Sequence, residues 1–124
     1  GEKMKLKYDA SKPIYEQIID KIKKMIVRGE LKPGDKLPSQ RKMAKKVEVN
    51  PNTIQRAYRE MENLDLVETK RGLGTFIIND EKIVKEISEE MANRTVDKFI
   101  SEMKSLSFNE KDILQVVKKN LEKI

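Results

Sequence analysis

Residues 49–61, VNPNTIQRAYREM, combine a helix start with an amphipathic repeat. Asn50 is a residue type that caps helices, and Pro51 suits the first helical position. Val49 and Ile54 stand where a hydrophobic staple needs them, directly before the cap and four residues after it. The following apolar positions have a helical period and predict a buried stripe of Ile54, Ala57, Tyr58, Met61 and Leu64. The opposite face then carries Asn52, Gln55, Arg56, Arg59 and Glu62.

Two further helices are predicted before this stretch. Residues 13–28, PIYEQIIDKIKKMIVR, place Ile14, Ile18, Ile22 and Met25 or Ile26 on one stripe, with Ile19 beside it. Pro13 suits the first helical position and Gly29 the stop. Pro33-Gly34 fits the centre of a type II turn. Ser39 is a suitable cap for a short helix over residues 40–47.

After Asp65 the pattern changes from helix to hairpin. LVETKRGLGTFII, residues 66–78, predicts two strands with Lys70, Arg71 and Gly72 at or near the tip. Asp80 is expected to cap a long helix reaching about Lys104. Asn109 and Asp112 predict a capping box for a last helix, whose inward positions are Ile113, Leu114, Val117, Leu121 and Ile124.

The charge of the chain is unevenly distributed. Of 124 residues, 39% are charged and 37% hydrophobic, and the formal net charge is +6. Residues 1–78 hold 18 Lys and Arg against 11 Asp and Glu, a net +7, whereas residues 79–124 hold 9 against 10, a net −1. A basic first part suggests a polyanionic partner. Charge excess alone fits a Lys-rich solvated surface equally well.

Several classes of site are excluded by composition. The chain has no cysteine and no histidine, so disulfides, Cys/His zinc sites and His-dependent catalytic triads are ruled out. GLGTF lies between predicted strands, which favours a turn over a phosphate loop. We therefore expect no enzyme activity, no metal and no cofactor. No apolar run approaches about 18 residues and no signal peptide is recognisable, so a cytoplasmic location away from membranes is expected.

The order of elements predicts a mainly α fold with a small β-hairpin. We expect a winged helix-turn-helix over residues 1–79 and a helical dimerisation tail over residues 80–124. In a helix-turn-helix the second helix enters the major groove, N-terminal end first. Asn and Gln bond adenine edges there, and Arg reads guanine or holds phosphate. Candidate DNA contacts are therefore Asn52, Thr53, Gln55, Arg56 and the outward Arg59, with Lys70 and Arg71 on the wing.

Each of these features has a simpler interpretation when it is taken alone. Asn-Pro at a helix start is ordinary capping, and a charged outer face is commonly just solvated. Only the basic helix pair, the amide-bearing face and the basic hairpin tip together favour nucleic-acid binding.

Residues 13–78 resemble the DNA-binding domain of GntR-type bacterial transcription regulators. PIYEQI, GELKPGDKLPSQRKMA, VNPNTIQRAYREME and RGLGTFI carry the resemblance, and VNPNT with the short tail is similar to the YtrA subgroup. It implies DNA contacts at Arg41, Asn50, Asn52, Thr53, Gln55, Arg71 and Gly72. Two positions depart from the family. Pro51 replaces a frequent arginine, which implies a different target sequence, and Lys42 cannot complete a capping box with Ser39.

The tail is expected to dimerise. A helix of about 25 residues extends roughly 37 Å, and its apolar side chains would form an unusually large exposed patch on a monomer. The resemblance likewise implies a dimerising two-helix appendage. The predicted interface is Ile87, Met91, Val96, Phe99, Ile100, Met103, Ile113, Val117 and Leu121. The alternative is that both helices fold back on the winged domain.

The function predicted is sequence-specific transcription regulation by a homodimer on an inverted-repeat operator. The resemblance implies repression and, for this subgroup, control of ABC-transporter operons. The 46 residues from 79 to 124 are few for a metabolite pocket, so any effector is expected between tail and winged domain or at the dimer interface. The alternatives are a nonspecific architectural nucleic-acid binder, a winged helix for RNA or protein contact, and an oligomerisation module. The amide side chains of Asn52 and Gln55 favour the sequence-specific regulator, because a protein that binds DNA irrespective of sequence needs Lys and Arg rather than amides.

Overall fold

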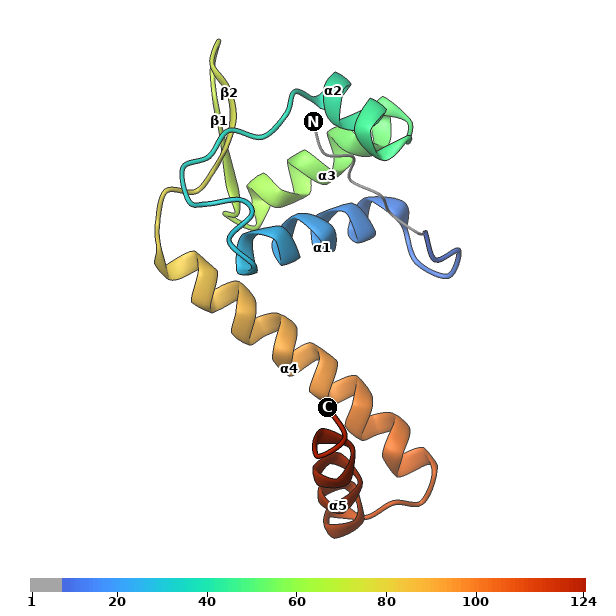
Figure 1. The fold of residues 1–124 in the computed structure, drawn as a ribbon. Coiled ribbons are helices and arrows are strands. Elements are labelled where there is room, and N and C mark those ends of the chain that lie inside the picture. Colours follow the sequence, from blue (N-terminus) through green and yellow to red (C-terminus); the bar gives the residue numbers. More distant parts are fainter. Residues whose placement is uncertain (1–7) are drawn as a thin grey trace. The chain divides into compact units, whose positions relative to one another are not determined.

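The computed structural model describes residues 8–124 and contains five helices and one hairpin within that range. The elements are α1 (Ile14–Val27), α2 (Gln40–Val47), α3 (Pro51–Asn63), β1 (Val67–Lys70), β2 (Gly74–Ile77), α4 (Lys82–Ser105) and α5 (Glu110–Leu121) (Figure 1). The predicted fold class, mainly helical with a small antiparallel hairpin, is confirmed.

The first compact unit, which ends at Ile87, is built around the contact between α1 and α3. Four isoleucines of α1 are buried at the spacing of one helical face: Ile18, Ile19, Ile22 and Ile26. Ile14, predicted on the same stripe, is exposed. Pro13 is the N-cap rather than the first helical residue, so α1 begins one residue later than predicted.

The stripe of α3 that faces this core is buried through Ile54, Ala57, Tyr58 and Met61. The Tyr58 hydroxyl donates a hydrogen bond of 2.7 Å to the carbonyl of Pro38. Burial raises the pKa of Tyr58 well above its ordinary range. The prediction that Leu64 continues the stripe is wrong, because its side chain is 50% exposed. The helix ends at Asn63, and Leu66 and Val67 of the following segment fill the core instead.

Four helix ends use a residue in the left-handed conformation, with φ of +77° at Gly29, +55° at Glu48, +58° at Asp65 and +67° at Ser107. In each case the next residue's N–H reaches back five positions, as in Leu66 N to Met61 O at 2.9 Å and Val49 N to Ala44 O at 3.1 Å. This is the Schellman arrangement, which satisfies carbonyls that have no partner inside the helix. Only one of these four positions is a glycine.

The turn between α2 and α3 is short because both of its ends are capped. The hydroxyl of Ser39 accepts a hydrogen bond from the N–H of Lys42 at 3.2 Å, so α2 starts as predicted. Asn50 Oδ1 accepts the N–H of Asn52 at 2.8 Å, and Pro51 occupies the first turn of α3. These caps confirm the predicted starts of both helices.

The hairpin pairs β1 with β2 in antiparallel register, from Val67 opposite Ile77 to Lys70 opposite Gly74. The predicted turn at Pro33-Gly34 is present: Asp35 N donates to Lys32 O at 2.9 Å, and Gly34 has a φ of +86°. A Cβ added to Gly34 would lie 3.1 Å from Asn79 Oδ1, so this glycine also permits a close approach.

The second compact unit covers residues 88–124. The boundary between the units therefore lies inside α4, and the predicted division at residues 79 and 80 stays a prediction. Ile83 and Ile87 in the first part of α4 and Met103 near its end are buried.

The predicted capping box of α5 is confirmed, because Asn109 and Asp112 exchange side-chain-to-backbone hydrogen bonds of 2.9 and 3.3 Å. The inward positions predicted for α5 are only partly right. Ile113 is buried, but Leu114, Leu121 and Ile124 are exposed, with Leu121 at 63%. A pair of helices buries only the facing side of each, so the outer apolar side chains of α5 remain on the surface of this unit.

Glu48→Gly should raise the free energy of unfolding by about 0.5–1 kcal/mol. A non-glycine residue pays about 1–2 kcal/mol in the left-handed conformation, and the extra entropy of glycine in the unfolded chain offsets part of that gain. Urea denaturation of both proteins measures the difference. Glu48→Ala is the control, because it removes the carboxylate and keeps the strained Cβ; equal stabilisation by alanine would contradict this explanation.

Asn50→Ala should lower the free energy of unfolding by about 1 kcal/mol, because the N–H of Asn52 loses its acceptor. Asn50→Ser retains an acceptor oxygen and should stay within a few tenths of wild type. Thermal or urea denaturation of the three proteins tests the cap. A loss of the same size in the serine variant would show that the cap contributes nothing.

Candidate nucleic-acid interface

The first turns of α3 present the polar residues predicted to contact DNA. Asn50, Asn52, Gln55 and Arg59 are exposed, and Thr53 is half-buried. They are exposed because the buried stripe of α3 occupies the other side of the helix. The partial positive charge of the helix dipole lies at this end of α3 and favours a negatively charged ligand. Three amides, a hydroxyl and a guanidinium are thus brought to one surface.

Arg56 is exposed and belongs to the same surface, but its guanidinium has a partner. It lies 4.0 Å from the centroid of the Tyr15 ring, which comes from the first turn of α1. A guanidinium over an aromatic face is held by cation–π attraction while its N–H groups still point outward. Tyr15 was not predicted from the sequence as part of this site. No local pattern relates two residues that the packing of α1 on α3 brings together.

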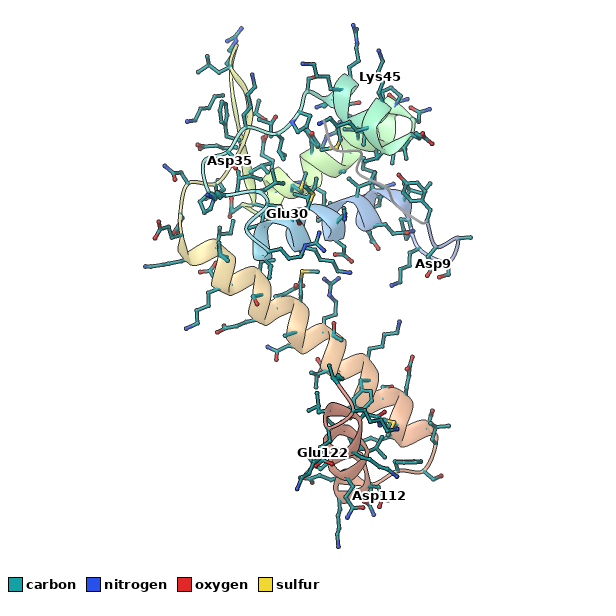
Figure 2. All side chains as sticks on the ribbon, viewed as in Figure 1. Asp9, Glu30, Asp35, Lys45, Asp112 and Glu122 are labelled. Atoms are coloured by element: carbon teal, nitrogen blue, oxygen red, sulfur yellow. The ribbon has the colours of Figure 1, made fainter. Side chains whose placement is uncertain are left out.

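The short helix α2 contributes a second group of cations. Arg41, Lys42, Lys45 and Lys46 are all exposed, and α2 contains no acidic residue. The Lys45 side chain extends away from the helix bundle (Figure 2). Met43, Ala44 and Val47 on the inner side are buried, which turns the basic side chains outward. The predicted contact residue Arg41 therefore stands at the exposed start of α2.

The hairpin tip carries the other predicted contacts. Lys70, Arg71 and Gly72 are exposed, and the N–H of Leu73 donates to Lys70 O at 2.8 Å to close the turn. Gly72 has a φ of +78° with open space around it, so the turn conformation is what requires glycine there. Leu73 at the same tip is 62% exposed, which the sequence did not single out. Apolar side chains of proteins that bind the minor groove often insert between base steps.

One hydrogen bond ties the hairpin to α3. The hydroxyl of Thr69 on β1 donates to Glu62 Oε2 at 2.6 Å, and Thr75 Oγ1 lies 3.4 Å from Thr69 Oγ1. Glu62 is the acidic member of the outward face of α3. Its carboxylate is thus directed to the hairpin and away from the helix start, where a negative charge would repel DNA.

The residues predicted at a dimer interface differ in how far their side chains are exposed to solvent. Ile87, Met103 and Ile113 are buried within the chain, Met91, Phe99, Ile100 and Val117 are half-buried, and Val96 and Leu121 are exposed. A groove of about 350 Å³ between α4 and α5 is lined by Ile100, Lys104, Glu110, Ile113 and Leu114. The interface itself stays a prediction, as do the DNA contacts.

Residues 8–124 contain neither a candidate metal site nor a helix suited to spanning a membrane. No group of three or more His, Cys, Asp or Glu side chains is placed to hold a metal ion. None of the described helices combines the length and the apolar character that crossing a membrane requires.

Comparison with known proteins identifies the family. The profile of the family described as bacterial regulatory proteins, gntR family, matches residues 14–77. YhcF of Bacillus subtilis, an uncharacterized HTH-type transcriptional regulator, is 49% identical over 111 residues, which cover 90% of this chain and 92% of YhcF. YtrA of the same organism, an HTH-type transcriptional repressor, is 49% identical over 73 residues, covering 59% of this chain and 56% of YtrA.

Solved structures agree with these relatives. A GntR family transcriptional regulator from Listeria monocytogenes superposes with a TM-score of 0.83 at 44% identity, covering 90% of this chain and 98% of its own. The DNA-binding domain of AraR in complex with its operator ORX1 matches with a TM-score of 0.53 at 25% identity, covering 59% of this chain and 93% of that domain. The predicted winged helix-turn-helix and the resemblance to GntR and YtrA-type regulators are thereby confirmed. The chain belongs to the GntR family and is a DNA-binding transcriptional regulator, not an enzyme.

Proposed function

We propose that the protein acts in the cytoplasm as a homodimeric repressor that recognises an inverted-repeat operator with the start of α3. The observation that carries the proposal is the exposure of Asn52 and Gln55 on the outward side of a buried helix. Amide side chains add no charge, so attraction to phosphate does not account for them. They are the side chains that bond both polar atoms of an adenine edge in the major groove.

Contacts to the DNA backbone are proposed for the cationic and small residues around α3. Five exposed cations are the candidates, and they come from all three elements of the site. They are Arg41 at the start of α2, Arg56 and Arg59 on α3, and Lys70 and Arg71 on the hairpin. Asn50, Thr53 and Gly72 complete the set, with Asn50 combining a contact and the cap. Phosphate contacts set the register of the protein on the duplex, and the base contacts then select the sequence.

Dimerisation is proposed through the second unit. Val96 on α4 is 49% exposed, and Leu114 and Leu121 leave an apolar strip on α5. Covering these side chains with a second copy would remove them from water and pair two winged domains about a two-fold axis. Two recognition helices spaced by a whole number of DNA turns require an inverted repeat.

Repression is supported by the relative YtrA, which is described as a repressor. The resemblance to that subgroup favours an ABC-transporter operon as the target.

Selection from a random duplex library at about physiological salt tests the proposal. Recovery of an inverted repeat with a defined half-site spacing is the expected result. Recovery of no motif, together with binding that collapses as salt rises, would show that only the backbone is contacted. In that case the alternative of a nonspecific architectural protein would replace the proposal.

Gln55→Ala should weaken binding to the selected duplex by about 1–3 kcal/mol and relax preference at one base position in each half-site. The reason is that the variant loses both polar atoms of the amide while the buried side of α3 is untouched. Repeating the selection with the variant gives the readout. Gln115→Ala, which removes an exposed amide from α5, is the matched control and should leave the motif intact. An unchanged motif in the Gln55 variant would refute the assigned role of α3.

Val96→Glu should convert the dimer to a monomer, because the proposed interface would have to bury an unpaired carboxylate at considerable cost. Sedimentation equilibrium measures the association state directly. Ser101→Glu places the same charge on an exposed position of α4 five residues on, away from the apolar strip, and should remain dimeric. A dimeric Val96 variant, or a wild-type protein that sediments as a monomer, would contradict the proposed interface.

A further inference from the structure

The segment between α1 and α2 runs beside β2 and is joined to it by backbone hydrogen bonds. Gly34 N donates to Ile77 O at 3.0 Å, Ile77 N to Asp35 O at 2.8 Å, and Leu37 N to Thr75 O at 2.8 Å. Lys36 stands opposite Phe76 as an isolated antiparallel bridge. These backbone bonds fix Lys36 beside β2, although it lies about forty residues earlier in the chain.

The side chain of Lys36 lies across Gly74. A Cβ added to Gly74 would be 2.7 Å from Lys36 Cε, 3.5 Å from Nζ and 3.7 Å from Cδ. The stem of the lysine therefore lies close to Gly74, where a Cβ would make it move. This places the ammonium group at the strand position that begins β2, directly after the tip formed by Arg71, Gly72 and Leu73. Lys36 is nevertheless an exposed residue.

A second cation lies on the same face of the hairpin. Lys70 is paired with Gly74, and its Nζ is 4.9 Å from the centroid of the Phe76 ring. Because side chains alternate along a strand, Lys70, Glu68, Phe76 and the bridge partner Lys36 share one face, which we call the outer face of the wing. Thr69 and Thr75 occupy the other face, where Thr69 bonds Glu62 of α3.

The charges on the outer face are not balanced. Glu68 Oε1 lies 3.7 Å from Lys70 Nζ and offsets that cation in part. Within residues 8–124 no carboxylate forms an ion pair with Lys36. With its stem beside Gly74 and no carboxylate partner among the described residues, the exposed Lys36 is available to an external anion.

We infer that Lys36 is a further contact to the DNA backbone, binding a phosphate beside the groove that the hairpin tip enters. This inference rests on the proposed function, since it assumes that the tip meets DNA. It adds a residue from outside the helix-turn-helix and the hairpin to the interface. A lone ammonium suits this role, because it neutralises one phosphate without reading a base.

Lys36→Met tests the inference, because methionine keeps an unbranched stem on Gly74 and loses the charge. Binding to the selected duplex is measured by fluorescence anisotropy over a range of KCl concentrations. The plot of log binding constant against log salt should become shallower by about 0.9 per protomer, the value for one phosphate contact on duplex DNA. The selected base sequence should not change. Lys24→Met, an exposed lysine of α1, should leave the slope as it is, and Arg71→Ala should flatten it.

Lys36→Arg separates charge from packing, since it restores the cation and should restore the wild-type slope. An unchanged slope in Lys36→Met, with a flattened one in Arg71→Ala, would overturn the inference and leave the proposed function standing. A flattened slope that arginine does not restore would also overturn it, because loss of packing would then be the cause. A wild-type protein that selects no sequence would instead reject the proposed function.

Discussion

The burial of one stripe of α3 against α1 is the constraint on which the recognition surface depends. Ile54, Ala57, Tyr58 and Met61 have almost no exposed surface, so α3 cannot rotate about its axis without moving large side chains out of the core. Since side chains of a helix are set by its period, burying this stripe turns Asn52 and Gln55 outward as a direct consequence. The site is therefore positioned by residues that take no part in binding.

The ends of the helices complete this placement. Caps at Ser39 and Asn50 and the left-handed Glu48 give the turn between α2 and α3 its short length, and Asp65 performs the same task between α3 and β1. Each satisfies backbone groups that a helix terminus otherwise leaves without a partner. Non-glycine residues at three of the four left-handed positions show that tertiary packing outweighs a local preference of about 1–2 kcal/mol.

Features set by neighbouring residues could be predicted from the sequence, and those set by distant ones could not. The caps at Asn50 and Asn109, the Pro33-Gly34 turn and the buried stripe of α3 are local and were predicted correctly. Leu64 was not, because a helical period says nothing about where the helix ends. Arg56 over Tyr15 and Lys36 across Gly74 join segments far apart in the chain, and no spacing rule relates them.

We propose that the start of α3 recognises DNA, with the beginning of α2 and the hairpin tip beside it. Amide chemical-shift mapping during titration with the selected duplex tests this claim most directly. The largest changes should fall on residues 39–41, 50–56 and 70–74. Changes concentrated in α5, with residues 50–56 unaffected, would contradict it.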